Sequence, residues 1–85
     1  MNNIIMRTVP VTADYQPLSA VSLVGSVTIS IPPSNVGGVF FRGDDGSDVF
    51  WRVGEWHVFH RIDLASVFVK GTPGDEVSVI GGTWE

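Results

Sequence analysis

Apolar and polar residues alternate along the segment 20–31, AVSLVGSVTISI, and this is the clearest pattern in the chain. On an extended strand, one face would carry Val21, Leu23, Val27, Ile29 and Ile31. The other face would carry Ser22, Ser26, Thr28 and Ser30, with Val24 as the exception. A period of two predicts a strand that is buried on one side. Gly25 is expected to mark a bulge or a bend within it.

Gly and Pro residues divide the rest of the chain into short apolar runs, which predicts strands joined by turns. The segment 32–38, PPSNVGG, ends the first strand, because proline cannot join a central ladder. The segment 7–13 is expected to be an edge strand, since Pro10 is tolerated at an edge. A turn or a single helical turn is expected at 63–66. The other expected strands cover residues 39–41, 49–51, 55–62, 66–70 and 76–80.

These elements add up to about seven short strands and almost no helix. The pattern predicts an all-β fold, a small β-sandwich or barrel with Greek-key or jelly-roll-like connections. The 85 residues fit a single β domain spanning 1–85. Within it, residues 1–12 would form an N-terminal arm or an edge strand.

The composition indicates that this domain has protein partners. The chain has no cysteine, so neither disulfides nor thiolate metal sites can support its small core. Hydrophobic residues make up 44% of the chain and charged residues 16%, against about 25% charged residues in an average domain. A small domain with this surplus would expose large apolar side chains, which usually mark contact sites. We therefore expect a homo-oligomer.

Charge and hydropathy argue against two other classes of partner. The formal net charge is −4 and the five basic residues are scattered, whereas nucleic-acid binding favours a basic face. No apolar run approaches the roughly 18 residues of a membrane span. The apolar run at the N-terminus is also too short for the core of a signal peptide. We expect no nucleic-acid or membrane partner, and synthesis in the cytoplasm.

The acidic segment 40–51, FFRGDDGSDVFW, offers two motifs. An EF-hand beginning at Asp44 fails, because Val49 stands where the calcium loop requires glycine. A looser calcium site built from Asp44, Asp45 and Asp48 stays open. The Arg-Gly-Asp tripeptide at 42–44 is interpreted as turn chemistry, because Gly-Asp is frequent in turns.

The sequence gives little support for a catalytic site. His57 and His60 are three residues apart, so on a regular strand they would point to opposite faces and could not share a metal. Ser66, His57 and Asp63 could be written as a triad, but neither a nucleophile elbow nor a glycine-rich oxyanion loop accompanies them. We expect no enzymatic activity, no catalytic or metal-binding residues and no cofactor.

The aromatic residues concentrated in 40–59 are the best candidates for partner contacts. Consecutive residues of a strand face opposite sides, so Phe50 and Trp51 cannot both point into the same core. The surplus either covers a partner or fills a larger core centred on Trp56. A third interpretation is a carbohydrate-binding face, on which aromatic rings stack against sugars. The candidate interface residues are Ile4, Ile5, Met6, Phe40, Phe41, Arg42, Phe50, Trp51, Arg52, Trp56 and Phe59.

The order of turn glycines and core valines over about residues 26–82 resembles small β-sandwich proteins from the structural gene modules of tailed phages. The pattern departs from the usual one at Val53, where proline is common. The matching residues are Asn35, Gly38, Val39, Gly43, Gly54, Glu55, Asp63, Leu64, Val67, Val69, Gly71, Gly74, Asp75, Val77 and Val79.

This resemblance implies a capsid decoration (cement) protein. Such a protein would be a symmetric oligomer, with a trimer favoured, that binds the major capsid protein on the outer face of the assembled shell. It would be made in the host cytoplasm and would end in the virion. The alternatives are a phage tail or host-recognition module and a carbohydrate-binding β-module.

Overall fold

The computed structural model describes residues 3–83 and contains two four-stranded antiparallel sheets, which confirms the predicted all-β class and the sandwich form of it. The described part of the chain contains eight strands and one 3₁₀ helix. In chain order these are β1 (Ile4–Pro10), β2 (Gln16–Pro17), β3 (Val24–Ser30), β4 (Val39–Arg42), β5 (Val49–Trp51), β6 (Trp56–Asp63), η1 (Leu64–Ser66), β7 (Phe68–Lys70) and β8 (Glu76–Gly82).

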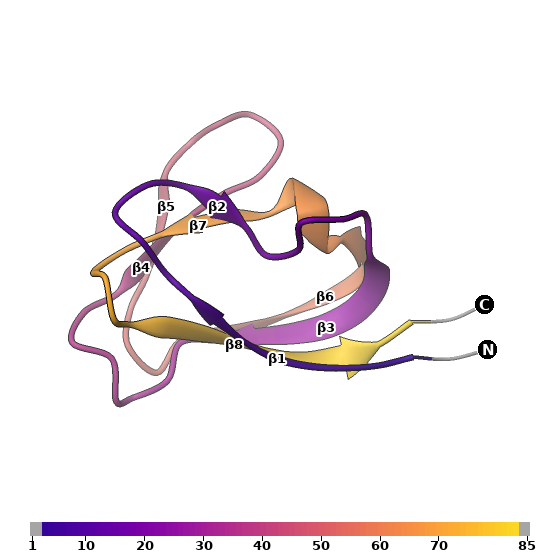
Figure 1. Cartoon of the computed structure of the whole chain (residues 1–85), viewed down its shortest axis with the longest axis horizontal. Coiled ribbons are helices and arrows are strands. Elements are labelled where there is room, and N and C mark those ends of the chain that lie inside the picture. The colour runs from indigo at the N-terminus through magenta and orange to yellow at the C-terminus, as the bar shows by residue number, and fades with distance from the viewer. Residues whose placement is uncertain (1–2, 84–85) are drawn as a thin grey trace.

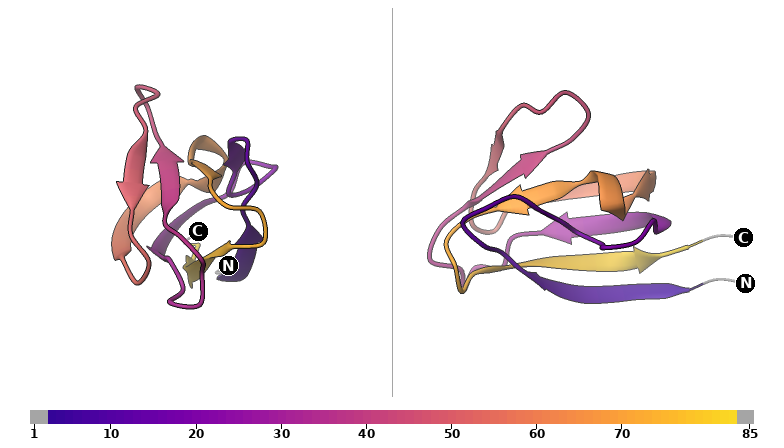
Figure 2. Two further views of the ribbon diagram at one scale, coloured as in Figure 1. Left: turned by 90° about the vertical axis from the view of Figure 1, so that its left-hand side faces the viewer. Right: turned by 45° about the horizontal axis from the view of Figure 1, so that its top comes forward.

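The chain passes repeatedly between the two sheets. The first sheet has the strand order β1-β8-β3-β6, and the second has the order β2-β7-β4-β5. The two layers lie face to face, and the loop between β4 and β5 projects away from the rest of the molecule (Figures 1 and 2). The last strand, β8, is an inner strand of the first sheet, and β1 lies at one edge of that sheet.

The core fills the space between the sheets with side chains from alternate positions of the strands. In β3 and β8 the buried positions follow the predicted period of two. The buried hydrophobic residues are Ile5, Val11, Leu18, Val27, Ile29, Ile31, Val39, Phe41, Trp51, Leu64, Val69, Val77 and Val79.

The strand predicted over 20–31 is shorter than expected, since β3 begins only at Val24. Val21 is 71% exposed, so its predicted place on the buried face is wrong. Residues 22 and 23, just before β3, donate hydrogen bonds to the Asp63 side chain and do not continue the strand. The Ser22 hydroxyl donates to the Asp63 carboxylate at 2.7 Å, and the Leu23 N–H donates to the same group at 3.0 Å. Side-chain capping of this kind competes with strand pairing.

The bulge predicted near Gly25 is present, but the extra residue belongs to β6. Val27 pairs with Phe59 and Gly25 pairs with Ile62, so two residues of β6 stand opposite one residue of β3. Arg61 has a left-handed φ of 53°, as a bulge of this kind requires. Because of the extra residue, Phe59 and Ile62 both pack against the core although they are three positions apart.

The N-terminal strand also differs from the predicted bounds. β1 begins at Ile4 and ends at Pro10, whereas the prediction was 7–13. Val11 instead donates its N–H to the Asp75 carbonyl at 3.0 Å. Residues 1 and 2 of the predicted arm lie outside the described residues. The two-residue strand β2 was not predicted, and the helical turn expected at 63–66 is η1, with Asp63 as its N-cap.

We expect the bonds of Asp63 to make the fold sensitive to acid. The Ser22 hydroxyl and the N–H groups of Ala65 and Leu23 hold the pKa of Asp63 below its usual value of 3.8. A lowered folded pKa contributes stability that is present above the unfolded pKa and is lost as the pH falls through the folded one. Urea unfolding midpoints measured from pH 6 to pH 2 should therefore fall less steeply for Asp63→Asn than for the parent. Asp44→Asn, in the exposed loop, is the control and should keep the parental slope.

Candidate interaction surfaces

The outer face of the first sheet carries a row of apolar side chains that crosses all four strands. Met6 of β1 pairs with Ile80 of β8, Ile80 pairs with Thr28 of β3, and Thr28 pairs with Val58 of β6. Directly opposite residues of an antiparallel pair point to the same face, so these side chains form one continuous line. Three of the four are large and apolar, and all three face solvent.

The next row on the same face ends in a tryptophan. It runs through Thr8, Ser78, Ser30 and Trp56, which are linked by the same registers. Neither row contains a charged side chain. We call the exposed apolar residues of these two rows, together with Ile4 of β1, the apolar face; they are Ile4, Met6, Trp56, Val58 and Ile80, with relative exposures of 51–71%. A continuous exposed apolar surface usually marks a contact site.

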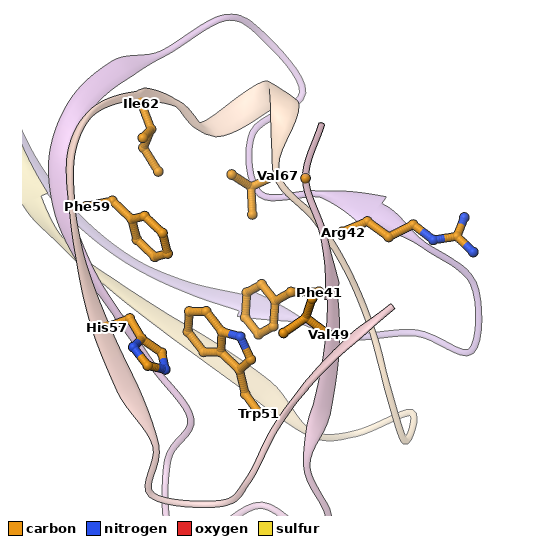
Figure 3. Close-up of a pocket in the computed structure, with 9 residues that line it drawn as sticks. Phe41, Arg42, Val49, Trp51, His57, Phe59, Ile62 and Val67 are labelled. Atoms are coloured by element: carbon orange, nitrogen blue, oxygen red, sulfur yellow. The ribbon is translucent and has the colours of Figure 1, made fainter. Parts of the chain in front are cut away.

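A cavity of about 430 Å³ opens between the sheets, where β6 faces β4 and β5 (Figure 3). The rings of Phe41 and Trp51 are stacked, with their centroids 3.9 Å apart, and form one wall. Phe59 and Ile62 form the opposite wall, and the Arg42 guanidinium points away from the space. The cavity wall can make apolar contacts with a bound group, and the cavity volume lies in the range of small-molecule sites. The lining residues are Phe41, Arg42, Gly43, Val49, Trp51, His57, Phe59, Ile62 and Val67.

His57 contributes a polar ring to the cavity wall, and one of its two ring nitrogens forms a hydrogen bond with another residue. Its Nε2 lies 2.6 Å from the Glu55 carboxylate, and this hydrogen bond is the main cause of the lowered pKa of Glu55. Asp63, for its part, bonds to Ser22 and Leu23. Two groups of the triad considered above, His57 and Asp63, are therefore paired with other residues.

A third cluster lies at the base of the β4–β5 loop. The Asp48 carboxylate accepts hydrogen bonds from the Tyr15 hydroxyl at 2.7 Å and from Arg42 Nε at 2.8 Å. Together these two bonds lower the pKa of Asp48. The Arg42 guanidinium also lies 4.2 Å from the centre of the Tyr15 ring, a cation–π contact. The Tyr15–Asp48 hydrogen bond links the β4–β5 loop to the residue just before β2.

Two of the three carboxylates of the acidic loop accept hydrogen bonds. Asp48 belongs to the Tyr15 cluster, and Asp45 accepts a hydrogen bond from the Ser47 N–H at 2.9 Å. Within residues 3–83, no group of three or more His, Asp or Glu side chains is placed to hold a metal ion.

Eight of the eleven predicted interface residues lie outside the buried core. Ile4, Met6 and Trp56 belong to the apolar face. Phe40 and Phe50 are exposed on the second sheet, where their ring centroids are 5.1 Å apart. Arg52 is exposed, Arg42 lies in the Tyr15 cluster, and Phe59 is half-buried beside the cavity.

Three of the predicted interface residues belong to the core instead. Ile5, Phe41 and Trp51 are each at most 6% exposed, so their assignment to the surface is wrong. The reason is alternation along the strands, which turns Ile5 away from the face that carries Ile4 and Met6.

The same alternation explains what the prediction missed. Val58 comes two positions after Trp56 and therefore lies on the same face of β6. The sequence shows this spacing, although Val58 was not among the predicted interface residues. Ile80 follows Val79 directly, so one of the two had to point outwards.

No protein-family model matches the chain, no curated protein matches its sequence, and no solved structure matches its fold. Within residues 3–83, no helix is long and apolar enough to cross a membrane.

Proposed function

We propose that the protein is a non-enzymatic structural component of a virion, a capsid decoration (cement) protein that self-associates and binds the outer face of the assembled shell. The observation that carries the proposal is the apolar face. Five large apolar side chains stand on one face of the first sheet, and the two rows that hold four of them contain no charged side chain. The resemblance to small phage β-sandwich proteins supports the same role.

In this proposal the apolar face contacts the major capsid protein. The second sheet, with the charged Tyr15 cluster and the acidic loop, then faces the solvent. A protein that binds only the assembled shell stabilises it by mass action, because disassembly would require its release. The net charge of −4 would keep the free protein soluble until it binds. The resemblance implies a trimer, but the contact with the shell does not depend on the number of subunits.

The test is binding to shells that lack the protein, measured by co-sedimentation. We expect Val58→Lys to weaken binding at least tenfold, which corresponds to about 1.4 kcal/mol, because it places a charge within the apolar contact. Val36→Lys makes the same change at an exposed position in the 32–38 turn and should bind like the parent. Equal binding by both variants would remove the apolar face from the contact. Particles that lack this chain, or whose heat tolerance is unchanged when it is stripped, would contradict the proposed function itself.

A carbohydrate-binding or host-recognition module is the second candidate, and one observation favours it. Trp56 is 61% exposed and stands in a row with the hydroxyl groups of Thr8, Ser78 and Ser30. An exposed aromatic ring beside hydroxyl groups is the arrangement that a sugar-binding surface uses. Glycan-array binding by the parent that is lost in Trp56→Ala would favour this candidate over the shell contact.

A further inference from the structure

The first sheet has one edge that is long and regular, while the other three edges in the described part of the chain are short or interrupted. β6 is interrupted by the bulge at Arg61, β5 has three residues, and β2 has two residues, one of which is Pro17. Short strands, bulges and prolines are the usual ways of blocking an edge. β1 runs without a bulge from Ile4 to Pro10 and pairs with β8 along its whole length.

The hydrogen bonds at the two ends of β1 show which backbone groups point away from the sheet. The Thr83 N–H donates to the Asn3 carbonyl, and the Val11 N–H donates to the Asp75 carbonyl, each across the β1–β8 pair. Hydrogen-bonded pairs alternate along an antiparallel ladder, so odd-numbered residues of β1 bond to β8. The backbone groups of Ile4, Met6 and Thr8 therefore point to the free edge. Pro10 also faces outwards, where its missing N–H costs no bond within the sheet.

This edge can pair with a second copy of itself, and the register centred on Met6 pairs Ile4, Met6 and Thr8 with one another. A two-fold axis at Met6 places Met6 opposite Met6 of the other copy and Ile4 opposite Thr8. Every outward N–H of Ile4, Met6 and Thr8 then meets a carbonyl. An axis at Arg7 would place two guanidinium groups opposite each other, which is unfavourable. An axis at Thr8 would place Met6 opposite Pro10, which has no N–H to donate.

We propose that two copies of the chain associate through β1, which joins their first sheets into one continuous eight-stranded sheet. The two apolar faces then lie on the same side, with Ile4 and Met6 of both copies at the centre. From strand spacing and rise, one four-stranded face covers roughly 19 by 23 Å in projection, or about 450 Å². The paired sheet covers about twice that area, comparable with the roughly 800 Å² per partner of a standard interface. The proposal rests on β1 alone and does not require the shell.

The absence of cysteine makes a direct test possible by single-cysteine cross-linking. In the proposed register, the two Met6 Cα atoms lie about 5.5 Å apart, within the range that a disulfide spans. Met6→Cys should therefore form a covalent dimer rapidly under mild oxidation. Thr8→Cys is the matched control, since the two Thr8 residues would be about 13 Å apart. Equal cross-linking of the two variants, or none in either, would overturn the proposed register.

The mass of the parent protein in solution provides the second measurement. Light scattering should give about twice the chain mass of 9.2 kDa. Met6→Lys should reduce it to one chain, because two ammonium groups would meet at the axis. Val58→Lys, at the far edge of the same face, should remain a dimer although we expect it to lose shell binding. A parent protein of one or three chains would refute pairing through β1 and would leave the shell contact to be judged by its own experiment.

Discussion

Gly81→Ala is expected to leave little folded protein under conditions in which the parent is fully folded. Gly81 lies in β8, opposite Val27 of the inner strand β3. A Cβ at this position would overlap the Ser26 carbonyl oxygen and would stand 2.7 Å from the Val27 Cα atom. Both atoms belong to the backbone of a paired strand, so they cannot move without breaking the ladder. Overpacking usually costs about 1–3 kcal/mol, and we expect about 3 kcal/mol or more here, because the neighbour cannot yield.

The matched control is Gly43→Ala, at the start of the loop between β4 and β5. A Cβ at Gly43 would have no heavy atom within 4 Å. Urea unfolding followed by tryptophan fluorescence, to which the buried Trp51 contributes, should show a near-parental midpoint for Gly43→Ala and a much lower midpoint, or no transition, for Gly81→Ala. Similar midpoints for the two variants would show that β3 and β8 can separate locally without loss of the fold.

Asp75→Ala should be the second most damaging change. Asp75 is only 5% exposed, and its carboxylate accepts hydrogen bonds from the N–H groups of Val36 at 2.9 Å and Gly37 at 3.1 Å. Removing the carboxylate would leave two donors without partners, at about 1–3 kcal/mol each. The expected loss of about 2–6 kcal/mol is large against a total of roughly 4–13 kcal/mol for a chain of this length.

Asp44→Ala provides the comparison, because it removes a carboxylate from an exposed position in the 43–48 loop. It should change the free energy of unfolding by less than about 0.5 kcal/mol, as surface substitutions usually do. Amide hydrogen exchange would identify the cause of the larger effect. In Asp75→Ala the Val36 and Gly37 amides should lose protection first. If these two amides keep their parental protection, the carboxylate is not what holds the turn.

The sequence predicted the elements well where alternation and turn chemistry agreed. The inward valines of β8 and the helical turn at Asp63 are examples. It predicted a bulge or a bend at Gly25 but could not assign the extra residue to β6, because that residue is Arg61 and no glycine marks the left-handed position. The strand order was also beyond reach, since β1 and β8 are neighbours in space but lie at opposite ends of the sequence. The excess of exposed apolar surface was predicted from composition, but its location required the register of four strands.

The motif residues of the resemblance have a structural explanation that the pattern alone did not provide. Asn35 donates its side-chain N–H to the Glu76 carbonyl at 2.7 Å and accepts from the Glu76 N–H at 3.1 Å. With Asp75 beside it, the turn after β3 is bonded to the start of β8. These two polar residues join the connection between β3 and β4 to the connection between β7 and β8. They account for fold and are not part of the apolar face.

The place of β8 in the first sheet also determines how this chain can be made. The ribosome releases β8 last, yet β8 lies between β1 and β3 and supplies partners to both. Until it emerges, β3 can pair with β6, but β1 has no partner in the first sheet. Closing so distant a pair as β1 and β8 carries an entropic cost and makes folding slow. β1 therefore stays unpaired until β8 has been synthesised, and β3 stays paired on one side only, so the first sheet cannot be completed before then.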